Sequence, residues 1–307
     1  MYPQHPSAPP SSQYSQPTQQ QFGSNPIGNA PPAQRSYLTS SEERMAKFQQ
    51  IVGQYEINQD FAMRLRNLEG FEIVFICDDS GSMGEITTAF ERRSTRWDEL
   101  KQTVSIVVDV CNVLDPDGVD IYFLNRQPLF HVKNSSELIP AFSIPPTGAT
   151  PLARCLRQVL RDKQAEIQER KLLVLIATDG VPTDDAGRND IRSLEQVLKH
   201  ERDPVERVLV TFIACTDDDE SIGYLNKWDE RIPKVDVCDD YRSEKREILK
   251  VQGKDFPFSF GDYVVKILMG SVDPWFDNLD NKKVRRQIGS STDRHTTSKR
   301  SSRCVIL

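Results

Sequence analysis

Cysteine and histidine patterns that bind metals are missing from the 307 residues of the chain. The cysteines at positions 77, 111, 155, 215, 238 and 304 form no C-x-x-C pair, and none of the four histidines stands at zinc-ligand spacing. This argues against a zinc site. We expect the first five cysteines, which stand in apolar or helical segments, to be reduced and buried, as in a cytoplasmic protein.

Long apolar runs are missing too. No stretch approaches the roughly 18 consecutive apolar residues of a membrane-spanning helix, and the N-terminal region lacks the apolar centre of a signal peptide. The composition, 37% hydrophobic and 27% charged, is typical of a soluble protein, and the length fits one domain of about 200 residues with tails.

Acidic residues are absent from residues 1–38, which are rich in Pro, Gln, Ser and Asn. Such a segment buries too little apolar surface to fold, so we expect a disordered arm. Residues 39–69 are expected to form lead-in helices, the first starting at a capping box of Thr39 and Glu42. The main domain is assigned to 70–278 and a basic flexible tail to 279–307.

Short apolar runs alternate with helical patterns from residue 70 onward. The runs cover 71–77, 119–124, 171–177, 207–214 and 235–238. Their nearly continuous apolar character is typical of parallel strands covered on both faces. Helices are expected from Thr95 to Leu114 and over 189–201, 218–228, 241–251 and 261–271. Another is expected with Thr150 at its N-cap and Pro151 in its first turn. This order predicts a doubly wound α/β fold, a mostly parallel sheet flanked by helices, whose ligands sit at the carboxyl ends of strands.

Polar side chains crowd the end of the first predicted strand, where Asp78, Ser80 and Ser82 stand two residues apart. The third strand ends in Asp179, and Thr150 stands in a loop, TGATPL, between them. Carboxylate and hydroxyl oxygens suit a hard divalent cation such as Mg²⁺, which accepts few protein ligands and keeps several waters.

These motifs together resemble a von Willebrand factor type A (vWA) domain with a metal-ion-dependent adhesion site. The family has a D-x-S-x-S motif, a threonine in a later loop and an aspartate in a T-D-G turn; the resemblance covers about Gly70 to Asp273. It implies a Mg²⁺ site, with Mn²⁺ possible, at Asp78, Ser80, Ser82, Thr150 and Asp179. It also implies an open coordination position that accepts an Asp or Glu carboxylate from a protein partner, hence an adaptor or scaffold and not an enzyme.

Plainer roles remain open for these residues. Thr150 could cap a helix, and Asp179 could form a turn before Gly180. Asp79 is expected to point away from the site. The charges at Asp184, Asp185 and 217–220 are expected to be solvated.

An enzyme would need further motifs. No G-x-G-x-x-G or Walker loop follows the first strand, and the phosphatase pattern Asp-x-Asp has Ser80 at its third position. Two alternatives stay open: a Mg²⁺-dependent phosphohydrolase using the same pocket, and a metal with a purely structural role.

The last residues, CVIL, match a CaaX prenylation box in which Cys304 would be geranylgeranylated. Residues 281–303 have a net charge of +7, whereas the rest of the chain has −13. The basic residues include Lys282, Lys283, Arg285, Arg286, Lys299, Arg300 and Arg303. One lipid chain plus a basic cluster suits an anionic membrane surface, so we expect a peripheral protein on the cytosolic face of a membrane. Nucleic acid is not expected as a partner, because no aromatic residue interrupts the basic run.

Overall fold

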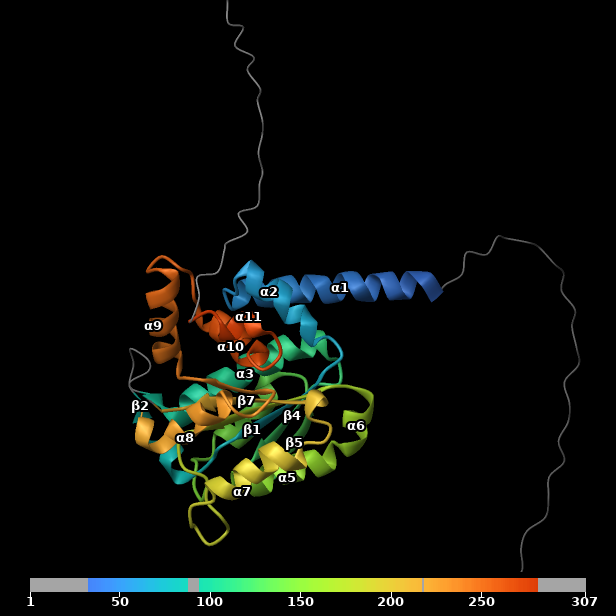
Figure 1. Cartoon of the computed structure of the whole chain (residues 1–307). Helices are drawn as coiled ribbons and strands as arrows, with labels where there is room; N and C mark the ends of the chain where they lie inside the picture. Colours follow the sequence, from blue (N-terminus) through green and yellow to red (C-terminus); the bar gives the residue numbers. More distant parts are fainter. Residues whose placement is uncertain (1–32, 88–93, 217, 281–307) are drawn as a thin grey trace, which may run out of the picture. The chain divides into compact units, whose positions relative to one another are not determined.

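A six-stranded sheet forms the centre of the protein (Figure 1). The computed structural model describes residues 33–87, 94–216 and 218–280. The strands of the sheet are β1 (Glu72–Cys77), β4 (Val119–Phe123), β5 (Leu129–Val132), β6 (Leu172–Thr178), β7 (Val208–Ala214) and β8 (Val235–Cys238). All pairs are parallel except β4 with β5. The five predicted parallel strands and the mostly parallel α/β fold are confirmed.

Helices precede, connect and follow the strands. They are α1 (Ala33–Gln54), α2 (Gln59–Leu65), α3 (Arg96–Leu114), α4 (Ile139–Phe142), α5 (Leu152–Asp162), α6 (Gln164–Glu169), α7 (Ile191–Gln196), α8 (Asp219–Asp229), α9 (Tyr241–Gln252), α10 (Phe260–Met269) and α11 (Pro274–Asp277). A π-helical turn, Val197–Glu201, continues α7. In the part of the chain that the structure describes, no helix is both long and apolar enough to cross a membrane.

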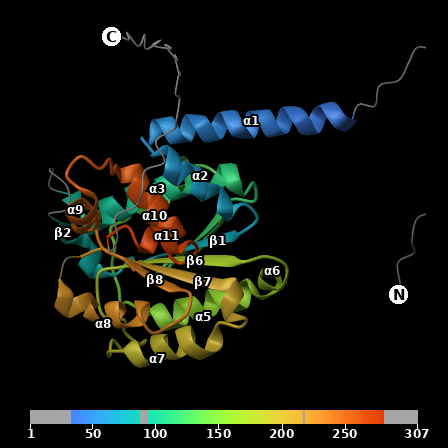
Figure 2. The ribbon, with the colours of Figure 1, turned by 45° about the horizontal axis from the view of Figure 1, so that its top comes forward.

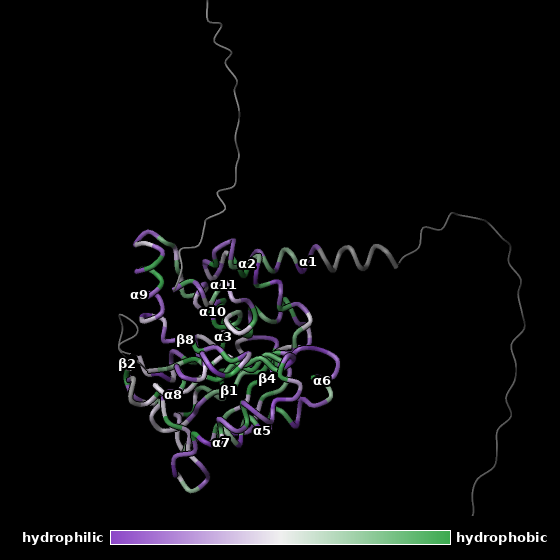
Figure 3. The backbone as a smooth tube through the Cα atoms, viewed as in Figure 1, coloured by the Kyte–Doolittle hydropathy of each residue, from purple (hydrophilic) through white to green (hydrophobic). Residues whose placement is uncertain are grey.

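The sheet has a buried core on each face, because successive strand residues point to opposite sides. Ile73 and Phe75 of β1 belong to the core under α3 and α10, whereas Val74 and Ile76 belong to the core under α5, α7 and α8. Figure 2 shows these helices on the two sides of the sheet, and in Figure 3 the hydrophobic part of the tube is concentrated in the central strands. Apolar runs without alternation are therefore explained by two-sided burial.

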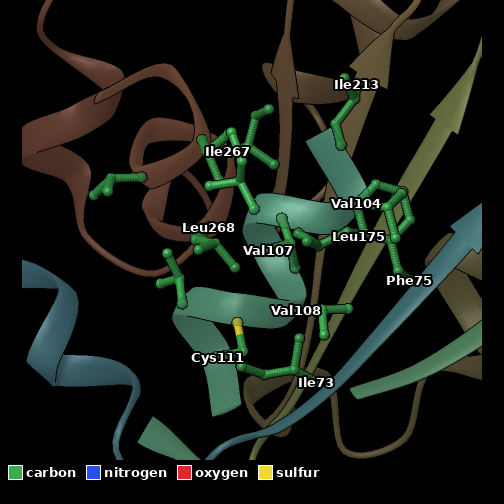
Figure 4. Packing of buried hydrophobic residues seen from close by; sticks show 14 of the residues in the cluster. Ile73, Phe75, Val104, Val107, Val108, Cys111, Leu175, Ile213, Ile267 and Leu268 are labelled. Atoms are coloured by element: carbon green, nitrogen blue, oxygen red, sulfur yellow. The ribbon is translucent and has the colours of Figure 1, made fainter. Parts of the chain in front are cut away.

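Helix α3 packs on β1 and β4, and α10 lies beside it and packs on β6 and β7. Figure 4 shows Val104 and Val107 of α3 among side chains from β1 and from Ile267 and Leu268 of α10. The helix starts where predicted, since Thr95 caps it and forms a capping box with Asp98.

The strand order is β5-β4-β1-β6-β7-β8. From β1 the chain first passes to β4 on one side and then crosses to β6 on the other, so the winding reverses at β1 and β6. In sheets of this kind a ligand crevice forms at the carboxyl ends of the two strands where the order switches. Asp78 directly follows β1, and Asp179 directly follows β6.

The opposite, amino end of the same strands holds a buried ion cluster. The Lys163 ammonium lies 2.7 Å from a carboxylate oxygen of Glu72 and 2.6 Å from one of Asp120. Arg170 also pairs with Glu72. This cluster ties β1 and β4 to the segment after α5.

Some predicted boundaries are wrong. Helix α1 begins at Ala33, before the expected capping box at Thr39, and α5 begins at Leu152 with Pro151 at its N-cap position. Strand β5 and the two-stranded hairpin of β2 (Ile86–Thr87) with β3 (Ser94–Thr95) were not predicted. The contacts between residues separate the chain into two units, Met1–Glu42 and Glu43–Leu307, and the boundary lies within α1. The predicted disordered arm, 1–38, is wrong for residues 33–38, which are helical, and its residues 1–32 lie outside the described residues. Residues 281–307 of the predicted basic tail, 279–307, lie outside them as well.

Candidate metal centre

Asp78 is completely buried at the end of β1. One carboxylate oxygen, Oδ1, accepts a hydrogen bond from the Ser80 backbone N–H at 2.9 Å, and the other, Oδ2, accepts one from the Thr178 hydroxyl at 2.7 Å. Thr178 is the last residue of β6, so the two central strands fix this carboxylate between them.

Asp179 is joined to the same loop. The Ser82 hydroxyl donates to its Oδ1 at 2.8 Å, and the hydroxyl oxygens of Ser80 and Ser82 lie 3.2 Å apart. Asp179 and Ser80 are buried, with 3% and 2% of their surface exposed. The structure therefore brings four of the five predicted ligands, Asp78, Ser80, Ser82 and Asp179, into one hydrogen-bonded group.

The loop that carries Thr150, the fifth predicted ligand, is hydrogen-bonded to the same segment after β1. The Gly81 N–H donates to the Gly148 carbonyl at 3.3 Å, and the Thr147 N–H donates to the Asp79 carbonyl at 2.7 Å. Thr150 itself is buried, and its backbone exchanges two hydrogen bonds with Thr183, one of them to the Thr183 hydroxyl. Since Pro151 occupies the N-cap position of α5 without a side-chain cap, Thr150 is not the capping residue of that helix.

Gly148 allows this loop to approach closely. Its φ is +110°, a conformation that other residues rarely adopt, and a Cβ at this position would lie 2.6 Å from the Asn125 side chain. The Asn125 amide in turn donates to the Ala149 carbonyl at 2.8 Å. A larger residue at 148 would strain the backbone and force either this loop or the Asn125 side chain to move.

Asp79 points away from the centre, as predicted, and has a structural role. Its Oδ1 accepts from the backbone N–H and the side-chain amide of Asn125, at 2.8 and 3.1 Å. Its Oδ2 lies 2.8 Å from Nε of Arg126. The Arg126 guanidinium donates to the carbonyls of Ala141, Ile144 and Pro145, which lead into the Thr150 loop. Asp79 thereby supports two loops of the site without being a ligand.

Arg96 is the residue of the site that the sequence analysis missed. Its Nη1 lies 2.8 Å from Oδ2 of Asp179 and 3.3 Å from Oε2 of Glu85, and its Nη2 donates to the Thr216 hydroxyl at 3.2 Å. Arg96 is the first residue of α3, where the helix dipole disfavours a cation. A basic residue at the start of a predicted helix was the feature of the sequence that could have identified Arg96, because it suggests an acidic partner nearby.

The charges of the centre are unbalanced. Burial, and secondarily the negative charge of Asp179, raises the pKa of Asp78 from 3.8 to about 7, against the opposing effect of its hydrogen bonds with Ser80 and Thr178. Those hydrogen bonds come from neutral groups, while Arg96 pairs with Asp179. A divalent cation would supply the missing positive charge.

The donor set also fits Mg²⁺ or Mn²⁺, which prefer carboxylate and hydroxyl oxygens. No cluster of three or more His, Cys, Asp or Glu side chains placed to hold a metal occurs within 33–87, 94–216 and 218–280. The candidate centre is of a different kind, because only two of its five predicted ligands, Asp78 and Asp179, are carboxylates.

Asp184 and Asp185, which were expected to be solvated, form ion pairs away from the candidate centre. Asp184 pairs with Arg188, and Asp185 pairs with Arg154 on α5. The five cysteines in the described residues are free thiols, and all but the half-buried Cys215 are buried.

Comparison with known proteins adds no functional assignment. No family model matches the chain, and no curated protein matches it. Among solved structures, it is similar to the crystal structure of the pilus adhesin SpaC from Lactobacillus rhamnosus GG, with 14% sequence identity and a TM-score of 0.42. The match covers 65% of this chain and 31% of the adhesin, so the chain spans less than a third of that protein.

Proposed function

We propose that this chain is a vWA-type domain that binds a protein partner through a divalent cation, Mg²⁺ or Mn²⁺. The ion is held by Asp78, Ser80, Ser82, Thr150 and Asp179, and the protein acts as an adaptor or scaffold. The observation that carries the proposal is a pair of buried carboxylates at the switch point of the sheet, of which one is paired with an arginine and the other only with neutral donors.

The donor types explain why such a site would capture an acidic side chain. Two carboxylates and three hydroxyls leave a bound divalent ion electron-poor, so that it supplies a strong attraction for a carboxylate of the partner. The residues of the chain hold the donors in place: Thr178 and the Ser80 N–H fix Asp78, and Ser82 fixes Asp179. The loops are already braced by Asp79 and Arg126, so little ordering is needed on binding.

A pull-down from cell lysate tests the proposal. Wild type and Asp78→Ala are compared in Mg²⁺ and in EDTA, and bound proteins are identified by mass spectrometry. A matched control is Asp184→Ala, which removes an acidic residue whose partner is Arg188 on the surface. We expect a partner that is captured by wild type and the control in Mg²⁺, and by neither in EDTA nor by Asp78→Ala in either buffer.

The same proteins separate the alternatives. Equal capture in all conditions would refute metal-mediated binding. If EDTA lowered the melting temperature without changing any interaction, the metal would be structural. Metal-dependent hydrolysis of a phosphate ester that is lost in Asp78→Ala would favour the phosphohydrolase.

We further propose that the basic tail and a geranylgeranylated Cys304 hold the domain at the cytosolic face of an anionic membrane. The tail lies outside the described residues, and the support is its charge of +7 beside the CVIL sequence. Cys304→Ser is expected to move the protein from the membrane fraction to the supernatant after cell fractionation. An unchanged distribution would refute the anchor and leave the metal site untouched.

A further inference from the structure

Arg96 is a permanent cation of the chain placed beside the candidate ligands. Only 17% of its side chain is exposed, and its Nη1 lies 2.8 Å from Oδ2 of Asp179 and 3.5 Å from the Ser82 carbonyl oxygen. The other oxygen of Asp179, Oδ1, accepts from the Ser82 hydroxyl. Both oxygens of Asp179 are thus engaged within the chain.

Glu85 offers the same guanidinium a second acceptor. The backbone N–H of Arg96 donates to the Glu85 carbonyl at 3.0 Å, so the two residues remain neighbours whatever their side chains do. Oε2 of Glu85 lies 3.3 Å from Nη1 of Arg96, and 67% of the Glu85 side chain is exposed. The guanidinium therefore lies between a buried carboxylate, that of Asp179, and a carboxylate at the protein surface.

We propose that Arg96 competes with the divalent cation for Asp179, and that Glu85 receives the guanidinium when the ion binds. This inference rests on the proposed function. A guanidinium bonded to Asp179 occupies an oxygen that the ion needs, and two positive charges so close repel each other. Metal loading would then be coupled to a movement of Arg96 from the buried to the exposed carboxylate.

The coupling sets the metal affinity of the native chain. Competition by Arg96 for Asp179 weakens the binding of the ion. The ion pair that Arg96 then forms with Glu85 restores part of the lost affinity. A coupling of this kind changes an affinity by roughly 5- to 150-fold. The arrangement would keep the site free of metal at low Mg²⁺, with Asp179 neutralised by the arginine.

The test is isothermal titration calorimetry of the metal-free full-length protein with Mg²⁺. Arg96→Gln removes the competing charge, and we expect it to bind Mg²⁺ roughly tenfold more tightly than wild type. Glu85→Gln removes the acceptor, and we expect it to bind roughly fivefold more weakly. The matched control Arg154→Gln removes an arginine that pairs with Asp185, not with Asp179, and we expect its affinity to equal that of wild type.

A melting experiment gives a second readout. Without metal, Arg96→Gln leaves Asp179 and Asp78 as neighbouring carboxylates without a cation, so its melting temperature should fall below that of wild type. Saturating Mg²⁺ should raise the melting temperature of Arg96→Gln by more than it raises that of wild type. If Arg96→Gln does not fold, Glu85→Gln decides the question, because Glu85 is at the surface.

The outcomes are distinct. If wild type binds Mg²⁺ and Arg96→Gln binds it equally or more weakly, Arg96 merely orients Asp179 and this inference is wrong, while the proposed function stands. If none of the proteins binds Mg²⁺, the proposed function fails and takes the inference with it. If Arg96→Gln alone binds, competition is supported in its strongest form, and metal-mediated capture by the native chain is refuted.

Discussion

Replacing Asp78 by asparagine is expected to stabilise the metal-free protein. In the folded state burial raises the pKa of this carboxyl to about 7, whereas an unfolded aspartate has 3.8. Between these values the folded state binds more protons than the unfolded state, so stability falls as the pH rises from about 4 to about 7. The difference corresponds to about 4 kcal/mol above pH 7 and to about 2 kcal/mol at pH 5.

Asparagine removes the charge but keeps the acceptor for the Ser80 N–H. The pKa of about 7 already includes the hydrogen bonds from Ser80 and Thr178, so what remains is the poorer fit of an amide NH₂ beside the Thr178 hydroxyl, which costs about 1 to 2 kcal/mol at either pH. We therefore expect Asp78→Asn to raise the free energy of unfolding by about 2 kcal/mol at pH 7.5, and to change it little at pH 5.

Urea denaturation in EDTA at the two pH values measures this effect. Asp179→Asn is the control, because Asp179 has a cationic partner in Arg96 and its loss should destabilise the protein by about 2 kcal/mol. Opposite signs at two carboxylates of one site would show that only Asp78 lacks a compensating charge. A less stable Asp78→Asn at pH 7.5, or an effect that does not depend on pH, would refute the reasoning.

Three further predictions concern the same centre and the cluster at the opposite end of the sheet. Mg²⁺ affinity should fall about tenfold per pH unit below pH 7, because the ion must displace the proton of Asp78; calorimetry that finds no pH dependence would contradict this. Asp79→Ala should lower stability by about 3 kcal/mol in urea denaturation, since the partly buried Arg126 loses its acid, and an unchanged midpoint would speak against the loop bracing. Lys163→Met should cost about 3 to 5 kcal/mol by the same assay, because Asp120 would remain buried without its ammonium partner and Glu72 would keep only Arg170; a cost below 1 kcal/mol would show that Asp120 takes up a proton or water instead.

The sheet was predictable because burial on both faces imposes continuous apolar runs on parallel strands. β6 and β7 are buried along their whole length, and their predicted ends differ from the observed ends by at most one residue. β5 escaped prediction because it is short and lies at the antiparallel edge, where Phe130 and His131 are exposed. Its sequence therefore has no continuous apolar run.

The grouping of Asp78 and Asp179 was predictable because it follows from strand ends and short motifs. Asp78 and Asp179 follow neighbouring central strands, and this placement alone brings their carboxylates together. Arg96 was not predictable in the same way, since a long flexible side chain can reach acceptors that no sequence spacing specifies. The support of Arg126 by Asp79 likewise depends on how separate loops pack.

The two sides of the centre are far apart along the chain. The hydrogen bond from Thr178 to Asp78 joins residues 100 positions apart, and the one from Ser82 to Asp179 spans 97. At a synthesis rate of about 5 to 20 residues per second, the first strand end leaves the ribosome roughly 5 to 20 seconds before its counterpart. During that interval Asp78 is an ordinary hydrated carboxylate. Its pKa rises only when β6 pairs with β1 and buries it beside Asp179. The raised pKa of Asp78 therefore reports that the two central strands have paired.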